Sequence, residues 1–200
     1  FVRHRVAMVS LIILVLEILS ILLLPLILDL DPFTSYPGQF NQAPGNGFLF
    51  GTDAVGRDIF SRIIYGGRVS LSVGFIAASI SALIGVPLGL IAGFYDNGVR
   101  GVIMRIVDIF MSFPALVIQM VLVTVLGASA RSLMLVLGFL GWTGYTRLVY
   151  SKVLSVKQEV YVEAAKSTGA TNLTQMVRYI LPNAMAPVFV TFSFAVAGNI

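Results

Sequence analysis

The sequence predicts an all-α fold, a polytopic bundle of membrane-spanning helices, and three observations support this. Hydrophobic residues make up 58% of the chain. Only 11% of the residues are charged, whereas soluble domains carry about 25%. About 20 apolar residues cross a hydrocarbon core of roughly 30 Å, and the chain has four complete runs of about this length and a fifth that is cut short.

The five predicted spans share an apolar interior and polar or turn-forming ends. They cover residues 6–28, 69–94, 106–126, 132–150 and 184–200. The last run is still apolar where the sequence stops, and the first residue is Phe1 rather than Met, so we expect a fragment that lacks both ends. The predicted organisation is a first transmembrane helix (1–28), an extracytoplasmic loop (29–68) and a transmembrane core (69–200).

A cleaved signal peptide is the rival interpretation of the first 28 residues. The apolar run of 6–28 is longer than the apolar centre of a signal peptide, about 7 to 15 residues, and it ends in Asp29-Leu30-Asp31-Pro32 without a small-residue cleavage site. We therefore expect a spanning helix. Glu17 lies near its middle, and because a charge there is costly, it should face the bundle, where it could also serve as a coupling-ion or proton site.

Basic residues predict the orientation, because Lys and Arg that flank spans tend to stay cytoplasmic. With the N-terminus inside, the cytosolic side holds nine of them: Arg3, Arg5, Arg100, Arg105, Arg147, Lys152, Lys157, Lys166 and Arg178. The outside holds four: Arg57, Arg62, Arg68 and Arg131. This distribution explains the net charge of +4 without a nucleic acid partner, since the basic residues flank spans and form no single patch.

Metal and cofactor sites are not expected. The chain has no cysteine, and its one histidine, His4, stands beside Arg3 and Arg5 as a solvated flank of the first span.

The external loop changes composition along its length. Residues 31–50 are rich in Pro, Gly, Asn and Gln, which favours turns. Residues 51–68 predict a short amphipathic helix at the outer interface, with Asp58 paired to Arg62 and Gly66-Gly67 as its end. The helix is either an anchor for the second span or a gate or docking surface for an external partner.

The second span carries small residues at four-residue intervals: Ala77, Ser81, Gly85, Gly89 and Gly93. Such a stripe lets another helix approach closely, and we interpret it as architecture rather than as a ligand site. Pro87 and Pro114 allow kinks in the second and third spans. In the fourth span, the glycine-rich stretch 138–144 either lines a path or fits a tight contact.

Charges near the ends of the third and fourth spans have local explanations. Asp108 can meet Arg105 at i−3, and Arg147 can extend its side chain to the cytosolic surface. Both are interpreted as structural.

A polar segment, residues 151–183, separates the last two predicted spans. A helix from Val156 to Thr168 should end at Gly169 in the left-handed conformation. Asn172 and Gln175 stand at capping-box spacing, and Pro182 should close the second helix. We call residues 151–183 the EAA segment, after the residues Glu163-Ala164-Ala165.

Two features of this segment favour a partner. Ala164 and Ala165 leave a low surface on which another protein could sit closely. Glu159 and Glu163 are like charges at i, i+4, which slightly destabilises an isolated helix and suits a partner that supplies compensating groups. A plain surface loop is the alternative.

Three motifs resemble the dipeptide/oligopeptide/nickel class of permeases of ATP-binding-cassette (ABC) importers, in particular the subunit with an external GTD-x-x-GRD-type motif. The external motif comprises Gly51, Thr52, Asp53, Gly56, Arg57 and Asp58, and continues through Arg68-Val69-Ser70-Leu71. The second motif is Gly141-Trp142-Thr143-Gly144-Tyr145-Thr146-Arg147. The third runs from Tyr161 to Gly169 and is followed by Leu181-Pro182-Asn183, with Tyr179 where the wider EAA pattern often has Ile.

The resemblance implies a type I importer permease that forms half of a translocation path for peptides or a similar small solute, such as a nickel complex. Its implied partners are a second, heterodimeric permease subunit, two cytosolic ATPase subunits, an extracytoplasmic substrate-binding protein and the lipid bilayer. It places the chain in the inner membrane of a prokaryote, with the N-terminus and the EAA segment cytoplasmic, and implies a six-span core. The residues implied to couple to the ATPase are Glu163, Ala164, Ala165, Gly169, Leu181 and Pro182.

The chain itself is not expected to be an enzyme. It has no GxxxxGK[ST] phosphate-binding loop, and no catalytic set converges at one predicted level. Two alternatives stay open: an ion-coupled secondary transporter that uses Glu17, although inverted repeats are not apparent, and a membrane scaffold. The sequence does not identify the substrate.

Overall fold

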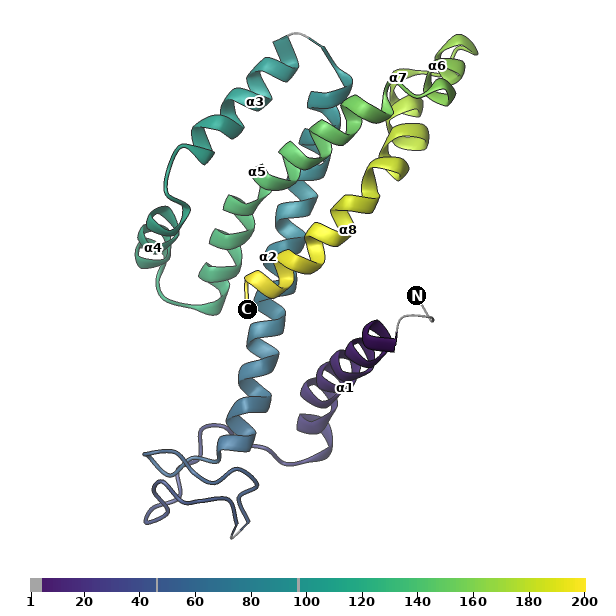
Figure 1. Cartoon of the computed structure of the whole chain (residues 1–200). Coiled ribbons are helices and arrows are strands. Elements are labelled where there is room, and N and C mark those ends of the chain that lie inside the picture. The colour runs from purple at the N-terminus through teal and green to yellow at the C-terminus, as the bar shows by residue number, and fades with distance from the viewer. Residues whose placement is uncertain (1–4, 46, 97) are drawn as a thin grey trace. The chain divides into compact units, whose positions relative to one another are not determined.

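The computed structural model describes residues 5–45, 47–96 and 98–200, in which every named element is helical (Figure 1). The chain divides into two compact units, Phe1–Leu71 and Ser72–Ile200, which are treated separately below. Within the described residues, four helices are long and apolar enough to cross a membrane, and a bent helix pair can form a fifth span.

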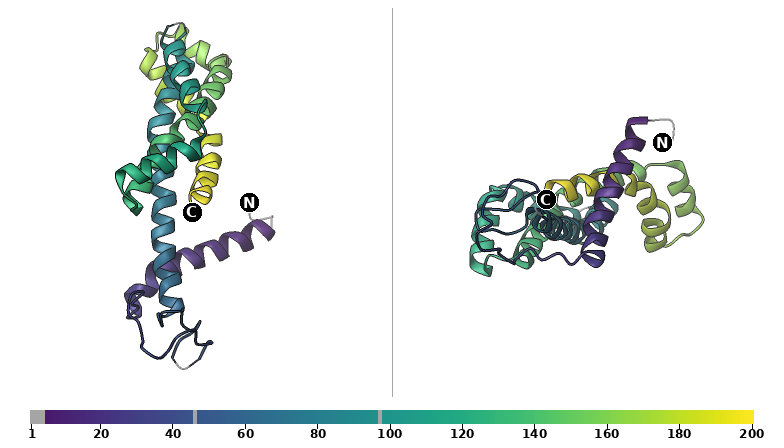
Figure 2. Two further views of the ribbon diagram at one scale, coloured as in Figure 1. Left: turned by 90° about the vertical axis from the view of Figure 1, so that its left-hand side faces the viewer. Right: turned by 90° about the horizontal axis from the view of Figure 1, so that it is seen from below.

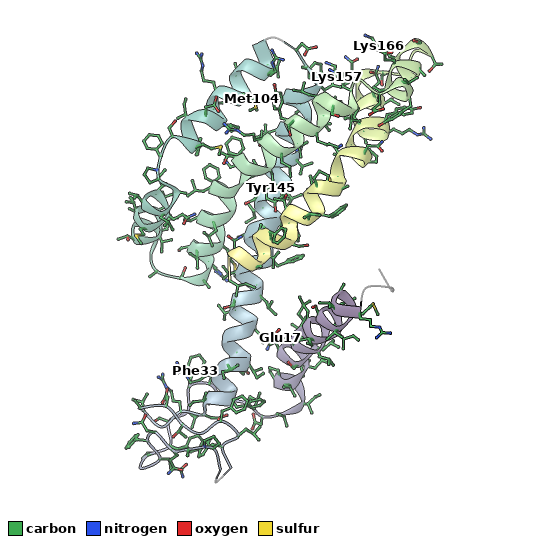
Figure 3. The ribbon with its side chains drawn as sticks, viewed as in Figure 1. Glu17, Phe33, Met104, Tyr145, Lys157 and Lys166 are labelled. Carbon is green, nitrogen blue, oxygen red and sulfur yellow. The ribbon has the colours of Figure 1, made fainter. Side chains whose placement is uncertain are left out.

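The first unit begins with α1 (Arg5–Ile27), which is apolar around its whole circumference. Its one buried residue is Ile21, whose side chain packs against Gly67, where a Cβ atom would lie 2.8 Å from Ile21 Cδ1. Glu17 is exposed on this helix, and its carboxylate makes no hydrogen bond or ion pair within the described residues (Figure 3). That Glu17 faces other helices of an assembled bundle stays a prediction, and His4 lies outside the described residues.

Helix α2 (Ile59–Phe94) is one continuous helix of 36 residues. The prediction that a separate interfacial helix ends at Gly66-Gly67 is therefore wrong. Neither glycine adopts a positive φ, and in an apolar surrounding a continuous helix keeps every backbone hydrogen bond, which outweighs a glycine penalty of about 1 kcal/mol each.

The predicted pairing of Asp58 with Arg62 is also wrong. The Asp58 carboxylate caps the start of α2, where it accepts hydrogen bonds from the Ser61 amide at 3.0 Å and the Ser61 hydroxyl at 2.6 Å. Arg62 Nε lies 3.6 Å from Asp53 Oδ2 instead. A short side chain at the helix start satisfies free amides, which is the usual use of Asp at an N-cap.

In the second unit, the small-residue stripe of α2 packs against α5 (Ala130–Val156). A Cβ atom at Gly85, Gly89 or Gly93 would come within 2.5 to 2.6 Å of atoms of α5. Ser81 Oγ donates a hydrogen bond to the Gly138 carbonyl at 2.9 Å across the same interface. The stripe is therefore a helix-packing surface, as predicted.

The predicted third span, 106–126, is broken. Helix α3 (Gly98–Met111) and helix α4 (Ala115–Leu126) are bent by 82° about the short break at residues 112–114. Pro114 takes an extended ψ of 111° as the N-cap of α4, and because its nitrogen carries no hydrogen, it cannot continue the α3 ladder.

An ion pair joins α3 to α5. Arg147 Nη2 lies 2.5 Å from Asp108 Oδ1, so the prediction that Asp108 pairs with Arg105 is wrong. The two residues lie 39 positions apart, and only the packing of α3 beside α5 brings them together (Figure 1).

The chain then forms α6 (Val160–Ser167), α7 (Asn172–Thr174), a π-helix η1 (Gln175–Ile180) and α8 (Leu181–Gly198). Helix α8 packs along α5, as the shared core residues show; Figure 2 gives two further views of the ribbon. The buried side chains shared by α5, η1 and α8 include Val149, Val153, Ile180, Ala184 and Val188.

Candidate functional site

The EAA segment folds into a helical hairpin between α5 and α8. The prediction of one helix from Val156 to Thr168 is only partly correct, because α5 ends at Val156 and α6 begins at Val160. The end of α6 is as predicted: Gly169 has φ +84°. The Ala170 amide donates to the Ala165 carbonyl and the Gly169 amide donates to the Lys166 carbonyl, both at 3.0 Å, which together form a Schellman motif.

The second helix of the hairpin has its N-cap one residue before Asn172, the residue at which the capping box was predicted. The N-cap is Thr171, whose Oγ1 accepts a hydrogen bond from the Thr174 amide at 3.3 Å. Gln175 does not cap Asn172. Its Nε2 donates to the Ala170 carbonyl at 2.8 Å and ties the connection after Gly169 to the π-helix.

Pro182 does not close this helix, contrary to the prediction. The chain runs from η1 directly into α8, and Pro182 occupies the first turn of α8. The wider i→i+5 turns of a π-helix change the hydrogen-bond register, so a residue without an amide hydrogen is accommodated at the junction.

The three residues of the EAA motif face different surroundings. Glu163 and Ala164 are exposed, but Ala165 is 5% exposed and packs inward with Val162. The prediction that both alanines form an outer surface is therefore wrong for Ala165. A helix of 3.6 residues per turn cannot present three consecutive residues on one face.

The described hairpin also exposes large apolar side chains. Val160 is 79% exposed and Leu173 is 67% exposed, and Tyr161 and Val177 are exposed as well. These side chains form an apolar surface on an otherwise polar segment, which is typical of an interaction site.

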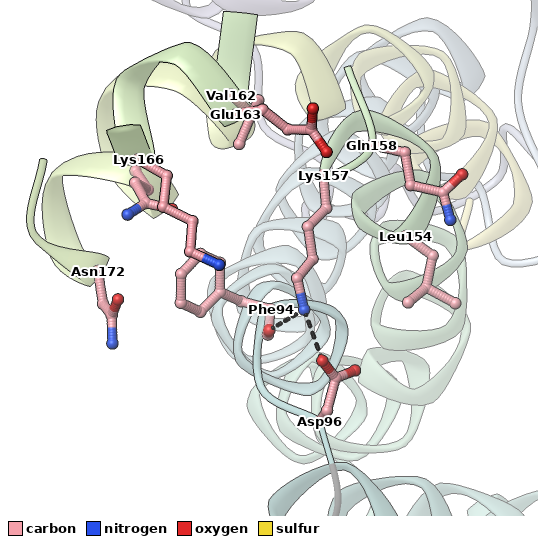
Figure 4. Close-up of a pocket in the computed structure, with 10 residues that line it drawn as sticks. Phe94, Asp96, Leu154, Lys157, Gln158, Val162, Glu163, Lys166 and Asn172 are labelled. Atoms are coloured by element: carbon pink, nitrogen blue, oxygen red, sulfur yellow. Dashed lines mark hydrogen bonds and ion pairs between the residues drawn. The ribbon is translucent and has the colours of Figure 1, made fainter. Parts of the chain in front are cut away.

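A groove of about 490 Å³ lies at the base of the hairpin (Figure 4). Glu163 and Lys166 of α6 line one side, and Asp96 and Lys157 line the other. Further lining residues are Phe94, Leu154, Gln158, Val162, Asn172 and Gln175.

Lys157 connects the ends of two helices within this groove. Its Nζ donates to the Phe94 carbonyl, at the end of α2, at 2.7 Å and to Asp96 Oδ2 at 2.9 Å. The ammonium also lies 5.6 Å from the centre of the Phe94 ring. A cation at a helix C-terminus satisfies free carbonyls and interacts favourably with the helix dipole, so Lys157 holds the end of α5 to the end of α2.

The pKa of Asp96 lies below its ordinary value. The hydrogen bond from Lys157 is the main cause, followed by the charges of Lys157 and Arg100. This pair could not be predicted from the sequence, because 61 residues separate Asp96 from Lys157. The clustering of basic residues around the span ends was the only local signal.

The external motif lies in the first unit and shapes its loop. Gly51 and Gly56 both have φ +77°. Each lies against backbone, and a Cβ atom would collide with the Gln42 carbonyl oxygen at Gly51 and lie 2.6 Å from the Tyr36 carbonyl oxygen at Gly56. Only glycine fits both positions without strain.

Thr52 is 3% exposed and bonds within the same loop. Its Oγ1 donates to the Gln39 carbonyl at 2.5 Å and accepts from the Gln42 amide at 3.0 Å. The hydroxyl thus holds residues 39–42 against the motif.

Asp53 organises the turn that follows. Its Oδ1 accepts from the Val55 and Arg57 amides, each at 2.9 Å, and its Oδ2 accepts from Arg57 Nε at 2.9 Å. The hydrogen bond from the Arg57 amide is the first cause of a pKa of Asp53 below its ordinary value. With Asp58 at the N-cap of α2, every member of the motif takes part in local structure. No group of residues suited to a metal ion occurs in the described part of the chain.

Long apolar helices, a small-residue packing stripe and a polar hairpin between two of the helices define a polytopic helical membrane protein. Residues 85–200 match the family described as binding-protein-dependent transport system inner membrane component, and residues 1–44 match the N-terminal TM domain of oligopeptide transport permease C. The chain belongs to the family of binding-protein-dependent transport inner-membrane components, and its fold is that of a type I ABC importer permease.

Three relatives illustrate the similarity. The chain is 38% identical over 197 residues to the dipeptide transport system permease protein DppC of Alkalihalophilus pseudofirmus, covering 98% of this chain and 65% of the relative. It is 35% identical over 196 residues to the oligopeptide transport system permease protein OppC of Bacillus subtilis, covering 98% and 64%. It is 33% identical over 172 residues to the glutathione transport system permease protein GsiD of Pectobacterium atrosepticum, covering 86% and 57%. The chain thus spans 57 to 65% of the length of these relatives.

Proposed function

We propose that this chain is part of a permease subunit of an ABC importer and that it forms half of a translocation path for peptides or similar small solutes. The observation that supports the proposal is the exposed surface of the hairpin formed by the EAA segment. Its exposed Glu163 and Lys166 border a groove, and large apolar side chains are exposed beside them. This surface suits a protein partner, and in this proposal the partner is an ATPase subunit.

The proposed orientation places this hairpin in the cytoplasm. The basic residues of the hairpin and of the α2–α3 connection support it, because Lys and Arg concentrate on the cytoplasmic side. Residues 29–58 then lie outside, where they would meet a substrate-binding protein that delivers the solute. A second permease subunit would complete the path.

The packing of the hairpin provides a route for force. Val162 and Ala165 on the inner face of α6 are buried, and Val162 belongs to the same core as Val153 of α5 and Ile180 of η1. Because a packed core transmits displacement rather than absorbing it, motion of α6 would move α5 and α8 together. Closure of the ATPase dimer would thereby switch the bundle between two states.

The proposed roles of the motif residues follow from their positions. Glu163 and Ala164 offer the contact surface, Gly169 sets the angle of the hairpin, and Leu181 with Pro182 forms the junction to α8. The peptide class of the solute rests on the names of the relatives, which transport dipeptides, oligopeptides or glutathione. ATP hydrolysis is assigned to the partner.

The test is assembly and uptake with candidate ATPase subunits. Lys166→Cys in the full permease should form a crosslink to an ATPase subunit that depends on nucleotide. Glu163→Gln should lower solute uptake per ATP hydrolysed, whereas Lys152→Gln on α5, outside the groove lining, is the matched control. If uptake proceeds without ATP and depends on Glu17, the protein is instead an ion-coupled transporter. If Lys166→Cys captures no nucleotide-dependent subunit, the proposal is refuted.

A further inference from the structure

Helix α3 has three distinct faces along its length. Val107 is fully buried. A second face is exposed and apolar, with Val102, Ile106 and Ile109 being 62%, 42% and 54% exposed. A third face is exposed and carries small or polar residues at helical spacing of three or four: Gly101, Arg105 and Asp108, followed by Ser112 directly after the helix end.

Helix α5 also has a buried side and an exposed polar side where it lies beside α3. One side packs against α2 and α8 through residues such as Val149 and Val153, which are fully buried. The opposite side is exposed and again small or polar at spacing of three or four: Gly144, Arg147, Ser151 and Ser155. The bridge between Asp108 and Arg147 joins the two faces into one surface, which we call the polar strip.

The location of the polar strip makes its exposure informative. Asp108 lies in α3, half of the bent pair that can form one span, and Arg147 lies in α5, which is long and apolar enough to cross a membrane. Their side chains are nevertheless 63% and 48% exposed. Charged groups within membrane spans face a bundle interior or a water-filled cavity, because the hydrocarbon of lipid leaves them without solvation. The apolar face of α3 beside the strip is suited to lipid, and the polar strip is not.

We propose that the polar strip of α3 and α5 lines the aqueous solute path of the assembled transporter. This inference rests on the proposed function and specifies which surface of the chain faces the solute. The strip carries two guanidinium groups against one carboxylate, and Arg105 has no ion-pair partner within the described residues. The excess positive charge favours a solute that bears a carboxylate, because a guanidinium pairs with a carboxylate through two parallel hydrogen bonds.

The test uses the absence of cysteine from these 200 residues. Single variants Ser112→Cys and Gly144→Cys place a thiol on the strip, at exposed positions inside the apolar stretches 106–126 and 132–150. Ile106→Cys and Ile109→Cys place one on the apolar face of α3 as matched controls within the same stretch. Each is introduced into the full permease, assembled with cysteine-free partners in nanodiscs, and treated with a charged methanethiosulfonate. The strip positions should react about tenfold faster or more than the controls, because the reactive thiolate forms where water reaches it.

Equal rates at the strip and control positions, whether fast or slow, would overturn the proposal, as would strip thiols that are protected by crosslinkable contact with the second permease. If one strip variant fails to assemble, the other strip variant carries the test alone. Co-purification of the ATPase and ATP-driven uptake are measured on the same preparations. If the ATPase does not co-purify and uptake is not driven by ATP, the proposed function is wrong. If only the expected difference in labelling is missing, the assignment of the polar strip is wrong.

The charge of the strip is tested with Arg105→Gln. This change should lower uptake of a peptide with a free terminal carboxylate several-fold more than uptake of its carboxamide. Arg100→Gln is the matched control on the same helix, because the Arg100 guanidinium lies 3.9 Å from Asp96, at the groove. Equal losses for the two peptides in the Arg105 variant would overturn the preference for a carboxylate.

Discussion

The external motif and the EAA segment use their motif residues in opposite ways. In the external motif, the side chains of Thr52, Asp53 and Asp58 form hydrogen bonds with backbone groups of nearby residues. In the EAA segment, Glu163 and Lys166 are exposed, and neither side chain forms an ion pair in the described part of the chain. The first motif builds a loop, whereas the second leaves charged side chains exposed and without an ion pair among the described residues.

This difference teaches how two motifs of similar length can be separated by structure. A residue whose donors and acceptors are satisfied locally affects the stability of its own segment when it is replaced. A residue whose polar atoms are free affects binding and leaves stability nearly unchanged, within about 0.5 kcal/mol for an ordinary surface position.

The largest effect is expected for Gly51→Ala. The new methyl group would overlap the Gln42 carbonyl oxygen, and the backbone would remain at φ +77°. Strained backbone alone costs about 1 to 3 kcal/mol, and the overlap adds to it. Protease cleavage within residues 35–58 should become rapid in the variant under conditions where the parent is resistant. Gly38→Ala, with no atom within 4 Å of its Cβ position, is the control for strain without overlap.

A smaller loss is expected for Thr52→Val. The change keeps the shape of the side chain but leaves the Gln39 carbonyl and the Gln42 amide without this partner. An unsatisfied buried polar group costs about 1 to 3 kcal/mol. Thermal unfolding of the loop, followed by proteolysis at increasing temperature, measures the loss. Thr52→Ser should restore most of the stability, and failure to do so would show that the hydroxyl is not the stabilising group.

A loss confined to strain is expected for Gly169→Ala. Gly169 has φ +84°, but no atom lies within 4 Å of its Cβ position. The left-handed conformation costs an L-residue about 1 to 2 kcal/mol. The variant should insert and fold, with a changed hairpin angle that lowers uptake per ATP. Gly169→Asn, which tolerates this conformation better, should lie between the parent and the alanine variant. Unchanged uptake in the alanine variant would contradict the role proposed for Gly169.

The smallest effect is expected from acid. The pKa of Asp53 is depressed in the folded loop, so the carboxylate stabilises the loop above its unfolded pKa of about 3.9. This stabilisation is lost as pH falls below that value and through the lower pKa of the folded state. Protease resistance of residues 35–58 should therefore decline below about pH 4. An Asp53→Asn variant should show a flatter pH dependence, and identical profiles would exclude Asp53 as the titrating group.

The sequence predicted most of what is local in this fold. The left-handed Gly169 is confirmed, because only glycine enters that conformation without cost and it followed a helix-compatible run. The close approach along Gly85, Gly89 and Gly93 is confirmed as well. Some of the errors lie at helix boundaries, because Gly66-Gly67 and Pro182 were expected to end helices. At the glycines, continuous helical hydrogen bonding in an apolar surrounding outweighs propensity, and at Pro182 the π-helix η1 accommodates a residue without an amide hydrogen.

Hydrophobic length, charge placement and glycine spacing determined by themselves that this chain is a helical membrane protein with a polar hairpin between its last two long helices. Each of these patterns involves residues that are close in sequence, within one or two helical turns or within the length of one membrane span, so the sequence alone reveals it. Only the tertiary structure decided that Lys157 joins Asp96, that Arg147 joins Asp108 and that Ala165 points inward. These depend on which helix faces lie together, and the free energy of packing between distant segments, rather than any local preference, selects them.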